Sequence, residues 1–270
     1  MSENAASLHR YHILGGEPFL QDELEQNIDF FMKNKCPDLI VSLFSNLSVD
    51  KDKFVEKLDK IKYLIVNKHV KIFYMFCSFD CWGPQAEYIR HGLKLKQWEE
   101  NFLTLLNEYP EISLHIHSTI TALTFDTFPE LCQRIKYWTL VRPVRHTIST
   151  VDSRPFLHPG IMPNYFYENK IKESISHYQD IIKLVQKVEY KHDYEQKDKI
   201  PLIRHYHEVI AQLKGFEKTF DAHKFDIDLL NKLKVYLNTN DYRRKTNWKA
   251  LWPWLEQITV ENTKLQKINL

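Results

Sequence analysis

The sequence lacks three features that would each place the protein in a class. No apolar run approaches the roughly 20 residues of a membrane-spanning helix, and the amino-terminal residues do not follow the basic-then-apolar order of a signal peptide. Neither sign of charge dominates, because 37 lysines and arginines stand against 35 acidic residues, a formal charge of +2. These absences give no case for nucleic acid or membrane as partners, and they predict a cytoplasmic globular protein.

Cysteine is also scarce, with four residues in the chain: Cys36, Cys77, Cys81 and Cys132. A chain of 270 residues buries a sizeable core without disulfides, and scattered cysteines are typical of a reducing compartment. Cys77 and Cys81 are close enough to suggest metal ligation. With no third cysteine nearby, we favour buried or loop thiols and expect no metal bound by this pair.

A short stretch near the amino terminus, Tyr11–Leu24, combines a strand-like apolar run with a turn of unusual composition. The turn consists of Gly15, Gly16, Glu17 and Pro18, and Pro18 suits the first turn of a following helix. Glycines at such a turn adopt positive φ and let a ligand approach the backbone, while a carboxylate can accept a hydrogen bond from an ammonium group. The alternative is an ordinary turn between a strand and a helix.

Strand-like apolar runs alternate with segments of helical period along the first 150 residues. The predicted strands are Tyr11–Leu14, Leu39–Phe44, Lys71–Ser78, Ser113–Thr121 and Val144–Val151. The predicted helices are Gln21–Lys33, Asp52–Ile65, Gln97–Glu108 and Pro129–Trp138. This alternation predicts an α/β fold with a parallel sheet, in which ligands bind where the carboxyl ends of the strands meet. The expected rim consists of Gly15–Glu17, Ser45–Asn46, Ser78–Asp80 and Thr119–Thr121.

The pattern becomes helical from about Glu168, with a charged run at Glu189–Lys199 and no further convincing strand. Within this helical part, Arg204–His207 is expected to lie on the surface. Three tryptophans near the end, Trp248, Trp252 and Trp254, are expected to anchor the last helix, with an aromatic substrate platform as the less favoured alternative.

Several segments resemble the radical S-adenosylmethionine enzymes, in particular the small members with a carboxyl-terminal twitch domain. The resemblance is carried by ILGGEPFL at Ile13–Leu20, FSN at Phe44–Asn46 and CSFDCWGPQAEYIRHG at Cys77–Gly92. Later landmarks of the same kind are LHPGIMPNYF at Leu157–Phe166 and YRRKTNWKALWPWL at Tyr242–Leu255. This resemblance implies a partial (βα)6-type TIM barrel over residues 1–155 that lacks its first strand, followed by a helical, twitch-like region over residues 156–270.

The same resemblance implies a set of ligand-binding residues. The turn at residues 15–18 would hold the methionyl ammonium of S-adenosylmethionine, while Ser78 and Arg90 would hold its ribose or carboxylate. An arginine presents a planar fork that matches a carboxylate, although a solvated helix charge is the alternative for Arg90. Asp80 and Asn46 complete the set. For both of them a local role is open, since Asp caps nearby backbone amides and Asn tolerates turns.

The chain departs from this family at its cluster ligands. Radical enzymes of this class hold a 4Fe-4S cluster with cysteines spaced C-x3-C-x2-C, yet no cysteine precedes Cys36. Cys77 and Cys81 have the first spacing, but Pro84 stands at the third position. The chain resembles a member that lost its first strand and cluster loop through a gene break, a misplaced start or the boundary of the cloned segment.

Two functions are therefore compatible with the sequence. One is a radical S-adenosylmethionine protein that needs an N-terminal partner fragment, supplied upstream or by another chain, to bind its cluster. The other is a catalytically inactive βα-barrel scaffold that recognises a nucleoside or a partner protein. No feature selects a small-molecule or peptide substrate, and no catalytic residue is assigned. His115 and His117 share one face of a strand, where they either touch substrate or, as we favour, form a structural pair.

Overall fold

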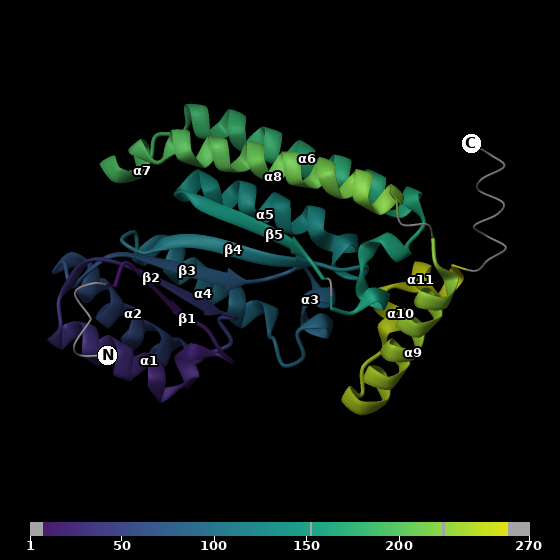
Figure 1. Ribbon diagram of the computed structural model, residues 1–270, viewed down its shortest axis with the longest axis horizontal. Helices are drawn as coiled ribbons and strands as arrows, with labels where there is room; N and C mark the ends of the chain where they lie inside the picture. Colours follow the sequence, from purple (N-terminus) through teal and green to yellow (C-terminus); the bar gives the residue numbers. More distant parts are fainter. Residues whose placement is uncertain (1–7, 152, 223–224, 259–270) are drawn as a thin grey trace.

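The computed structural model describes residues 8–151, 153–222 and 225–258 (Figure 1). Its centre is a five-stranded parallel sheet with the strands in sequential order. The strands are β1 (Arg10–Ile13), β2 (Cys36–Ser45), β3 (Val70–Ser78), β4 (Ser113–Ile120) and β5 (Val144–Thr150). The predicted α/β class and all five predicted strands are confirmed. Within the described residues, β1 and β5 do not pair with each other.

Helices connect consecutive strands. They are α1 (Asp22–Lys33), α2 (Lys51–Val66), α3 (Pro84–Ile89), α4 (Leu95–Glu108) and α5 (Phe128–Val141). Short 3-10 turns lie at η2 (Pro18–Leu20), η3 (Thr124–Thr127), η4 (Pro155–Leu157) and η5 (Pro159–Ile161). Helix α2 begins after Asp50, whose carboxylate accepts hydrogen bonds from the backbone N–H groups of Asp52 and Lys53. This is the side-chain cap that the first turn of a helix requires.

The two faces of the sheet differ in burial. Along β3, Phe73 and Met75 are fully buried, whereas their neighbours Tyr74 and Phe76 remain half-buried. Successive strand residues point to opposite faces, so one face lies under the helices and the other is more open. We call this second face, which carries Tyr74, Phe76 and His115, the open face.

The carboxyl-terminal helices lie beyond β5 and extend the helical layer that contains α5. Figure 1 shows α6 (Asn164–Lys187) and α8 (Lys199–Ala222) side by side along α5, with the short α7 (Asp193–Lys197) between them in the chain. Helix α8 covers the edge of β5. The Tyr206 hydroxyl donates to the Val144 carbonyl at 2.5 Å, and the Gln212 amide donates to the Ile148 carbonyl at 2.7 Å. Side-chain donors thus satisfy the edge strand, which would otherwise offer unpaired backbone groups.

The expected surface position of Arg204–His207 is therefore wrong for half of that segment. Tyr206 is fully buried, and His205 contacts the backbone of His146 at 2.9 Å. These two residues face β5 because the helical period turns them toward the strand, while Arg204 and His207 remain exposed.

The last described helices are α9 (Ile227–Arg244), α10 (Trp248–Leu251) and α11 (Pro253–Gln257), which lie beside α3. Trp248 and Trp252 are buried, and the Trp252 ring meets Tyr88 of α3 edge-on at 5.2 Å. The Tyr88 hydroxyl also donates to Asp241 at 3.0 Å. These contacts agree with the expected anchoring role of the tryptophans. No helix in the described part of the chain is long and apolar enough to cross a membrane.

The opposite edge of the sheet, at β1, has no such cover among the described residues. The His9 carbonyl accepts from the Ile40 N–H at 3.0 Å, so alternate residues bond to β2 and the backbone of Arg10 and His12 faces outward. Beside this edge Leu14 is 67% exposed and Leu20 is 61% exposed. An unpaired strand edge flanked by exposed leucines favours pairing with another chain.

We predict that the purified chain self-associates in a concentration-dependent way through this edge. Leu14→Lys together with Leu20→Lys should shift the population toward monomer, because charged side chains oppose edge-to-edge pairing. Analytical ultracentrifugation over a range of concentrations measures the shift. Leu103→Lys, at a partly exposed position on α4, is the matched control and should leave association unchanged. A wild-type chain that stays monomeric throughout would contradict the prediction.

Candidate functional site

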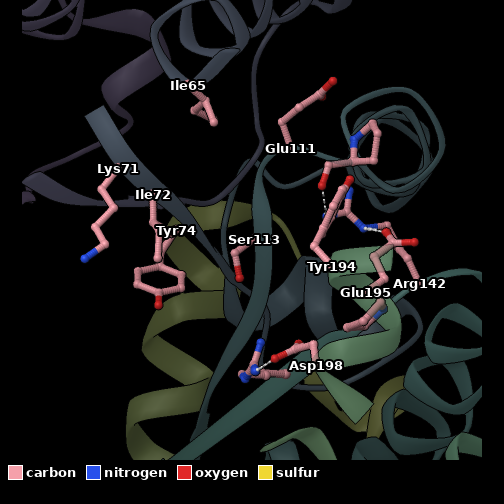
Figure 2. A pocket seen from close by; sticks show the side chains of 13 residues that line it. Ile65, Lys71, Ile72, Tyr74, Glu111, Ser113, Arg142, Tyr194, Glu195 and Asp198 are labelled. Carbon is pink, nitrogen blue, oxygen red and sulfur yellow. Dashed lines mark hydrogen bonds and ion pairs between the residues drawn. The ribbon is translucent and has the colours of Figure 1, made fainter. Parts of the chain in front are cut away.

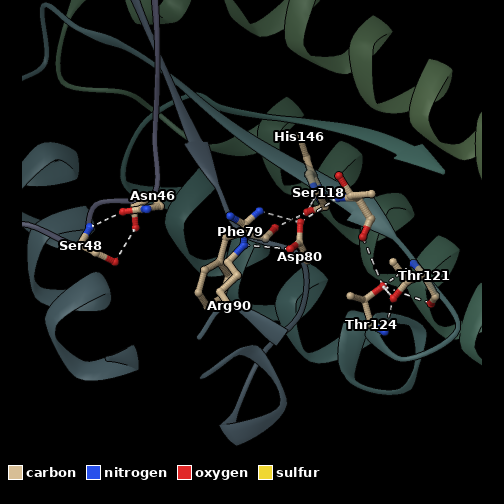
Figure 3. A network of polar contacts seen from close by, with 10 residues as sticks. Asn46, Ser48, Phe79, Asp80, Arg90, Ser118, Thr121, Thr124 and His146 are labelled. Atoms are coloured by element: carbon tan, nitrogen blue, oxygen red, sulfur yellow. Dashed lines mark hydrogen bonds and ion pairs between the residues drawn. The ribbon is translucent and has the colours of Figure 1, made fainter. Parts of the chain in front are cut away.

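The carboxyl ends of β1 to β4 bring the predicted rim residues together. The turn after β1 reaches the end of β2 through Glu17, and the segment after β3 reaches the end of β4 through Asp80. Figure 3 shows the second of these connections, with Asp80, Arg90 and Ser118 close together and Asn46 on a neighbouring loop. The four strand ends thus form one polar rim, as the parallel arrangement predicts.

Glu17 links the first two strand ends. It precedes η2, and its Oε1 accepts from the Phe19 N–H at 3.2 Å and from the Ser45 hydroxyl at 2.8 Å. Its Oε2 accepts from the Asn46 N–H at 2.8 Å. Burial raises the pKa of Glu17, and these hydrogen bonds oppose that shift. The Leu47 N–H also hydrogen-bonds to this carboxylate. Four donors match the roughly four acceptor positions of a carboxylate, so Glu17 offers a ligand its negative charge rather than a free acceptor position.

The two glycines of the turn leave their backbone accessible. Gly15 has φ +136°, a conformation that L side chains rarely adopt, and a Cβ at Gly16 would lie 3.2 Å from the Gln21 amide nitrogen. Both glycines are exposed. Because Pro18 begins η2 directly after them, the turn is fixed on one side and open to an approaching ligand on the other.

Asp80 and Arg90 form an ion pair that joins β3, α3 and β4. Arg90 donates from Nε and Nη2 to the two Asp80 oxygens, at 2.8 and 3.0 Å, and Asp80 also accepts from the Thr119 N–H at 2.9 Å. Asp80 thus binds a backbone amide, but that amide is 39 residues away on β4 and not in the loop that Asp80 begins, as the local alternative expected. The fork of Arg90 lies on Asp80, which leaves Nη1 for any further acceptor.

Asn46 and Ser78 lie on the same rim but differ in their hydrogen bonds. The side-chain oxygen of Asn46, Oδ1, accepts a hydrogen bond from the Ser48 N–H at 2.8 Å, which is the local turn contact expected of asparagine. The Ser78 hydroxyl, half-buried on the open face opposite His117, has no hydrogen-bond partner in the described part of the chain. Ser78 is thus free to bind a ligand without losing a contact of the fold.

A fully buried polar chain supports the rim from below. Ser118 Oγ donates to the Phe79 carbonyl at 2.5 Å and lies 2.7 Å from His146 Nε2. The other His146 nitrogen, Nδ1, lies 2.6 Å from the Tyr178 hydroxyl, which in turn accepts from the Cys132 thiol. One direction of donation satisfies every member, with the proton of His146 on Nε2. Sequence reasoning missed this chain, because its bonded members are 28 to 46 residues apart and follow no motif.

His115 and His117 lie on the open face, as their alternation in the strand predicted. His115 is 9% exposed and packs against Phe76 at 4.5 Å and edge-on against Tyr74 at 5.1 Å. His117 lies 6.2 Å from the Phe44 ring. Burial lowers the pKa of His115 to about 3 and also lowers that of His117. Packing among rings agrees with a structural role for His115, but its Nε2 is buried and has no hydrogen-bond partner among the described residues, so its hydrogen bonding is not satisfied.

The cysteines do not form a metal-binding set. Cys77 and Cys81 are fully buried, and burial raises the pKa of both thiols. Iron–sulfur clusters need thiolate ligands, which this environment disfavours. Across residues 8–151, 153–222 and 225–258, no group of three His, Cys, Asp or Glu side chains is placed to hold a metal ion. These residues therefore do not fit a 4Fe-4S cluster.

Comparison of the chain with protein-family models, with curated proteins and with solved structures gave no match. Its function must therefore be argued from its own residues and geometry.

We predict that acid weakens the fold through its buried histidines. Folding depresses the pKa of His115 and of His146 to about 3, so the unfolded chain binds more protons between about pH 6.5 and 3. Their contribution is present above pH 6.5 and is lost as the pH falls, by about 1.4 kcal/mol per pH unit for each histidine. Urea unfolding at pH 7 and pH 5 measures the slope. His115→Phe, which removes one titrating ring, should reduce it; an identical slope in the variant would contradict the assignment.

We also predict that the isolated chain, reconstituted anaerobically with iron and sulfide, retains no 4Fe-4S centre after desalting. Its four cysteines are buried and dispersed, so three thiolates cannot converge on one cluster. Visible absorption and iron analysis of the desalted protein provide the measurement. Stoichiometric iron with a broad charge-transfer band would show that the cysteines rearrange.

Proposed function

We propose that the chain is the S-adenosylmethionine-binding part of a radical S-adenosylmethionine protein. In this proposal it acts with a cluster-binding segment that bears C-x3-C-x2-C, supplied from upstream or by another chain. The proposal is supported by one observation: the residues that the family resemblance named lie on a common rim of the sheet. Glu17, Asn46, Ser78, Asp80 and Arg90 come from three separate strand ends and lie on one rim.

The topology gives further support. Strands in sequential order, joined by right-handed crossovers, place the helices on one face of the sheet. This arrangement fits the winding of a barrel better than that of a doubly wound sheet, in which the order reverses and helices cover both faces. A partial barrel with an unpaired edge at β1 is the arrangement that the proposed function requires, since that edge would receive the strand of the missing segment.

The unsatisfied groups of the rim fit a methionyl and ribosyl ligand. The exposed backbone carbonyls at Gly15 and Gly16 and the negative charge of Glu17 would hold the ammonium group. The Ser78 hydroxyl and Arg90 Nη1 would hold a carboxylate or the ribose hydroxyls. Given one electron from the cluster of the proposed segment, S-adenosylmethionine would supply the radical that abstracts hydrogen from a substrate. The contribution of these residues is to orient it against the open face.

The proposal predicts loss of S-adenosylmethionine affinity in two rim variants. Glu17→Gln removes the negative charge that would attract the ammonium group, which should weaken binding about tenfold. Ser78→Ala should weaken it several-fold and leave stability unchanged, because the hydroxyl has no partner among the described residues. Calorimetric titration measures affinity. Thermal unfolding checks the fold of the Glu17→Gln variant, since its new amide group would face the Asn46 N–H.

Glu208→Gln is the matched control for this titration. Glu208 is an exposed carboxylate on α8, which covers the β5 edge, so the width of the sheet separates it from the turn after β1 and its loss should not change affinity. Unchanged binding in both rim variants would return the turn at residues 15–18 to an ordinary strand-to-helix connection. The genomic sequence immediately 5′ of the Met1 codon tests the missing segment separately, since a frame encoding C-x3-C-x2-C would supply the cluster ligands.

A further inference from the structure

Cavities of different character lie at the two ends of the sheet. The larger, of about 460 Å³ at the amino ends of β4 and β5, has two arginines in its lining, and both are in ion pairs, with Glu195 and with Asp198 (Figure 2). A smaller pocket of about 60 Å³ lies at the carboxyl end of β4. Its walls are α9, the end of α3, η4 and the loop after β4. We call it the α9 pocket.

Helix α9 contributes three side chains to this pocket: Tyr236, Asn240 and Arg244. They are spaced four residues apart, so they lie along one side of the helix. Contacts at both ends of this row fix the helix. The Tyr236 ring lies 5.3 Å from the Phe156 ring of η4, and Arg244 Nη1 donates to the Tyr88 carbonyl of α3 at 3.3 Å. The pocket is therefore formed by the packed fold.

Asn240 is the residue of this row that the fold leaves incomplete. It is 7% exposed, and its amide has no hydrogen-bond partner among the described residues. Both amide atoms nevertheless retain accessible surface, unlike the covered and unpaired Nε1 of Trp252. A buried amide without a partner is unfavourable, and native structures normally supply one from the protein, from water or from a ligand. The α9 pocket thus favours a polar occupant.

Arg244 brings a positive charge to the same pocket. It forms no ion pair within the described part of the chain, and its contact with Tyr88 leaves Nε and Nη2 for an acceptor. Asp241, the acid nearest to it along α9, is already bound by three donors. These are the Tyr88 hydroxyl at 3.0 Å, the Thr246 hydroxyl at 2.7 Å and the Trp248 N–H at 2.8 Å. The guanidinium therefore lacks a counter-ion among the described residues.

The chemistry of these groups selects the ligand. An arginine fork matches the two oxygens of a carboxylate, and an asparagine amide can donate to one of them. A volume of about 60 Å³ equals the share of roughly two waters at ~30 Å³ each, which suits two carboxylate oxygens better than the four of a phosphate. We propose that the α9 pocket binds the carboxylate group of a small organic acid through Arg244 and Asn240.

The position of the pocket gives this acid a role. Ile89 of its lining directly precedes Arg90, and Thr121 of its lining ends the predicted rim segment Thr119–Thr121. An acid anchored by its carboxylate therefore places its remaining atoms next to the rim, which makes carboxylic acids the substrate class. This role rests on the proposed function, whereas binding of the carboxylate does not.

Titration of the ¹⁵N-labelled full chain with sodium acetate at constant ionic strength tests the proposal. The side-chain NMR signals of Asn240 and Arg244 should shift and saturate, with a dissociation constant on the order of millimolar for so small a ligand. Arg244→Gln, followed at Asn240, should weaken binding about tenfold, and Asn240→Leu, followed at Arg244, several-fold. Arg243→Gln changes an exposed arginine of the same helix and is the matched control.

Asn240→Leu also gives a readout of the unpaired amide. The substitution removes no hydrogen bond of the described chain, so the thermal unfolding temperature should not fall. A clear fall would show that the amide is bound within the fold and would overturn the proposal.

Three further results would overturn it. These are no saturable shift at tens of millimolar acetate, tighter binding of inorganic phosphate than of acetate, and equal loss of affinity in Arg243→Gln and Arg244→Gln. The first two use the wild-type chain, so they decide the matter even where a variant fails to fold.

A parallel titration with S-adenosylmethionine separates this proposal from the proposed function. Asn240→Leu should not change that affinity, and a loss would place the methionyl carboxylate in the α9 pocket instead of a second acid. A wild-type chain that binds acetate at these signals but does not bind S-adenosylmethionine would support the pocket and contradict the proposed function.

Discussion

Sequential strand order combined with the right-handed rule for crossovers constrains every other feature of this molecule. Each connection from one strand to the next must pass over the same face of the sheet, so the helices accumulate there and bury the alternate strand residues beneath them. A parallel sheet is normally covered on both faces. Here Tyr74 and Phe76 remain half-buried on the open face, which leaves that side of the sheet for a ligand or another chain.

The same constraint explains which polar groups lie at the rim and which lie in the core. Parallel strands end at a common edge, where loops of different sequence meet, and Glu17 and Asp80 each bind donors from the neighbouring strand end. Beneath this edge, burying a polar atom is costly unless the atom has a hydrogen-bond partner. The chain from Cys132 through His146 to Ser118 meets this requirement completely, and its last bond holds the Phe79 carbonyl next to Asp80. Hydrogen bonds in this way connect the buried core to the rim.

Much of the fold follows from local pattern, while the pairing of side chains does not. The strand predicted at Val144–Val151 is observed at Val144–Thr150, because its alternating apolar residues have the period of a strand. Strand β2 begins at Cys36, three residues before the predicted Leu39, since the exposed Pro37 and Asp38 conceal its start. Helix α3 was not predicted as an element, although Pro84 at its first turn is a recognised start signal.

For the rim residues too, the sequence indicated where they lie in the fold but not which residues they bind. Strand ends located Asp80 and the region of Arg90, but no spacing rule says that an arginine ten residues on lays its fork on that aspartate. For the same reason the sequence could not locate the cavity of about 460 Å³ at the amino ends of β4 and β5. Its charged residues lie on β3, β5, α7 and the loop before β4, which are brought together only by the order of the strands.

The two ends of the sheet therefore differ in electrostatic character for a structural reason. At the carboxyl ends the acidic groups are already bound by backbone and side-chain donors, so a ligand there must rely on exposed backbone and on free hydroxyls such as Ser78. At the amino ends the loop before β4 is held by Arg142, which donates to backbone carbonyls and lies 3.5 Å from Glu195. Because both side chains are buried and a buried charge is stable only when paired, this ion pair holds the loop before β4 and α7 together.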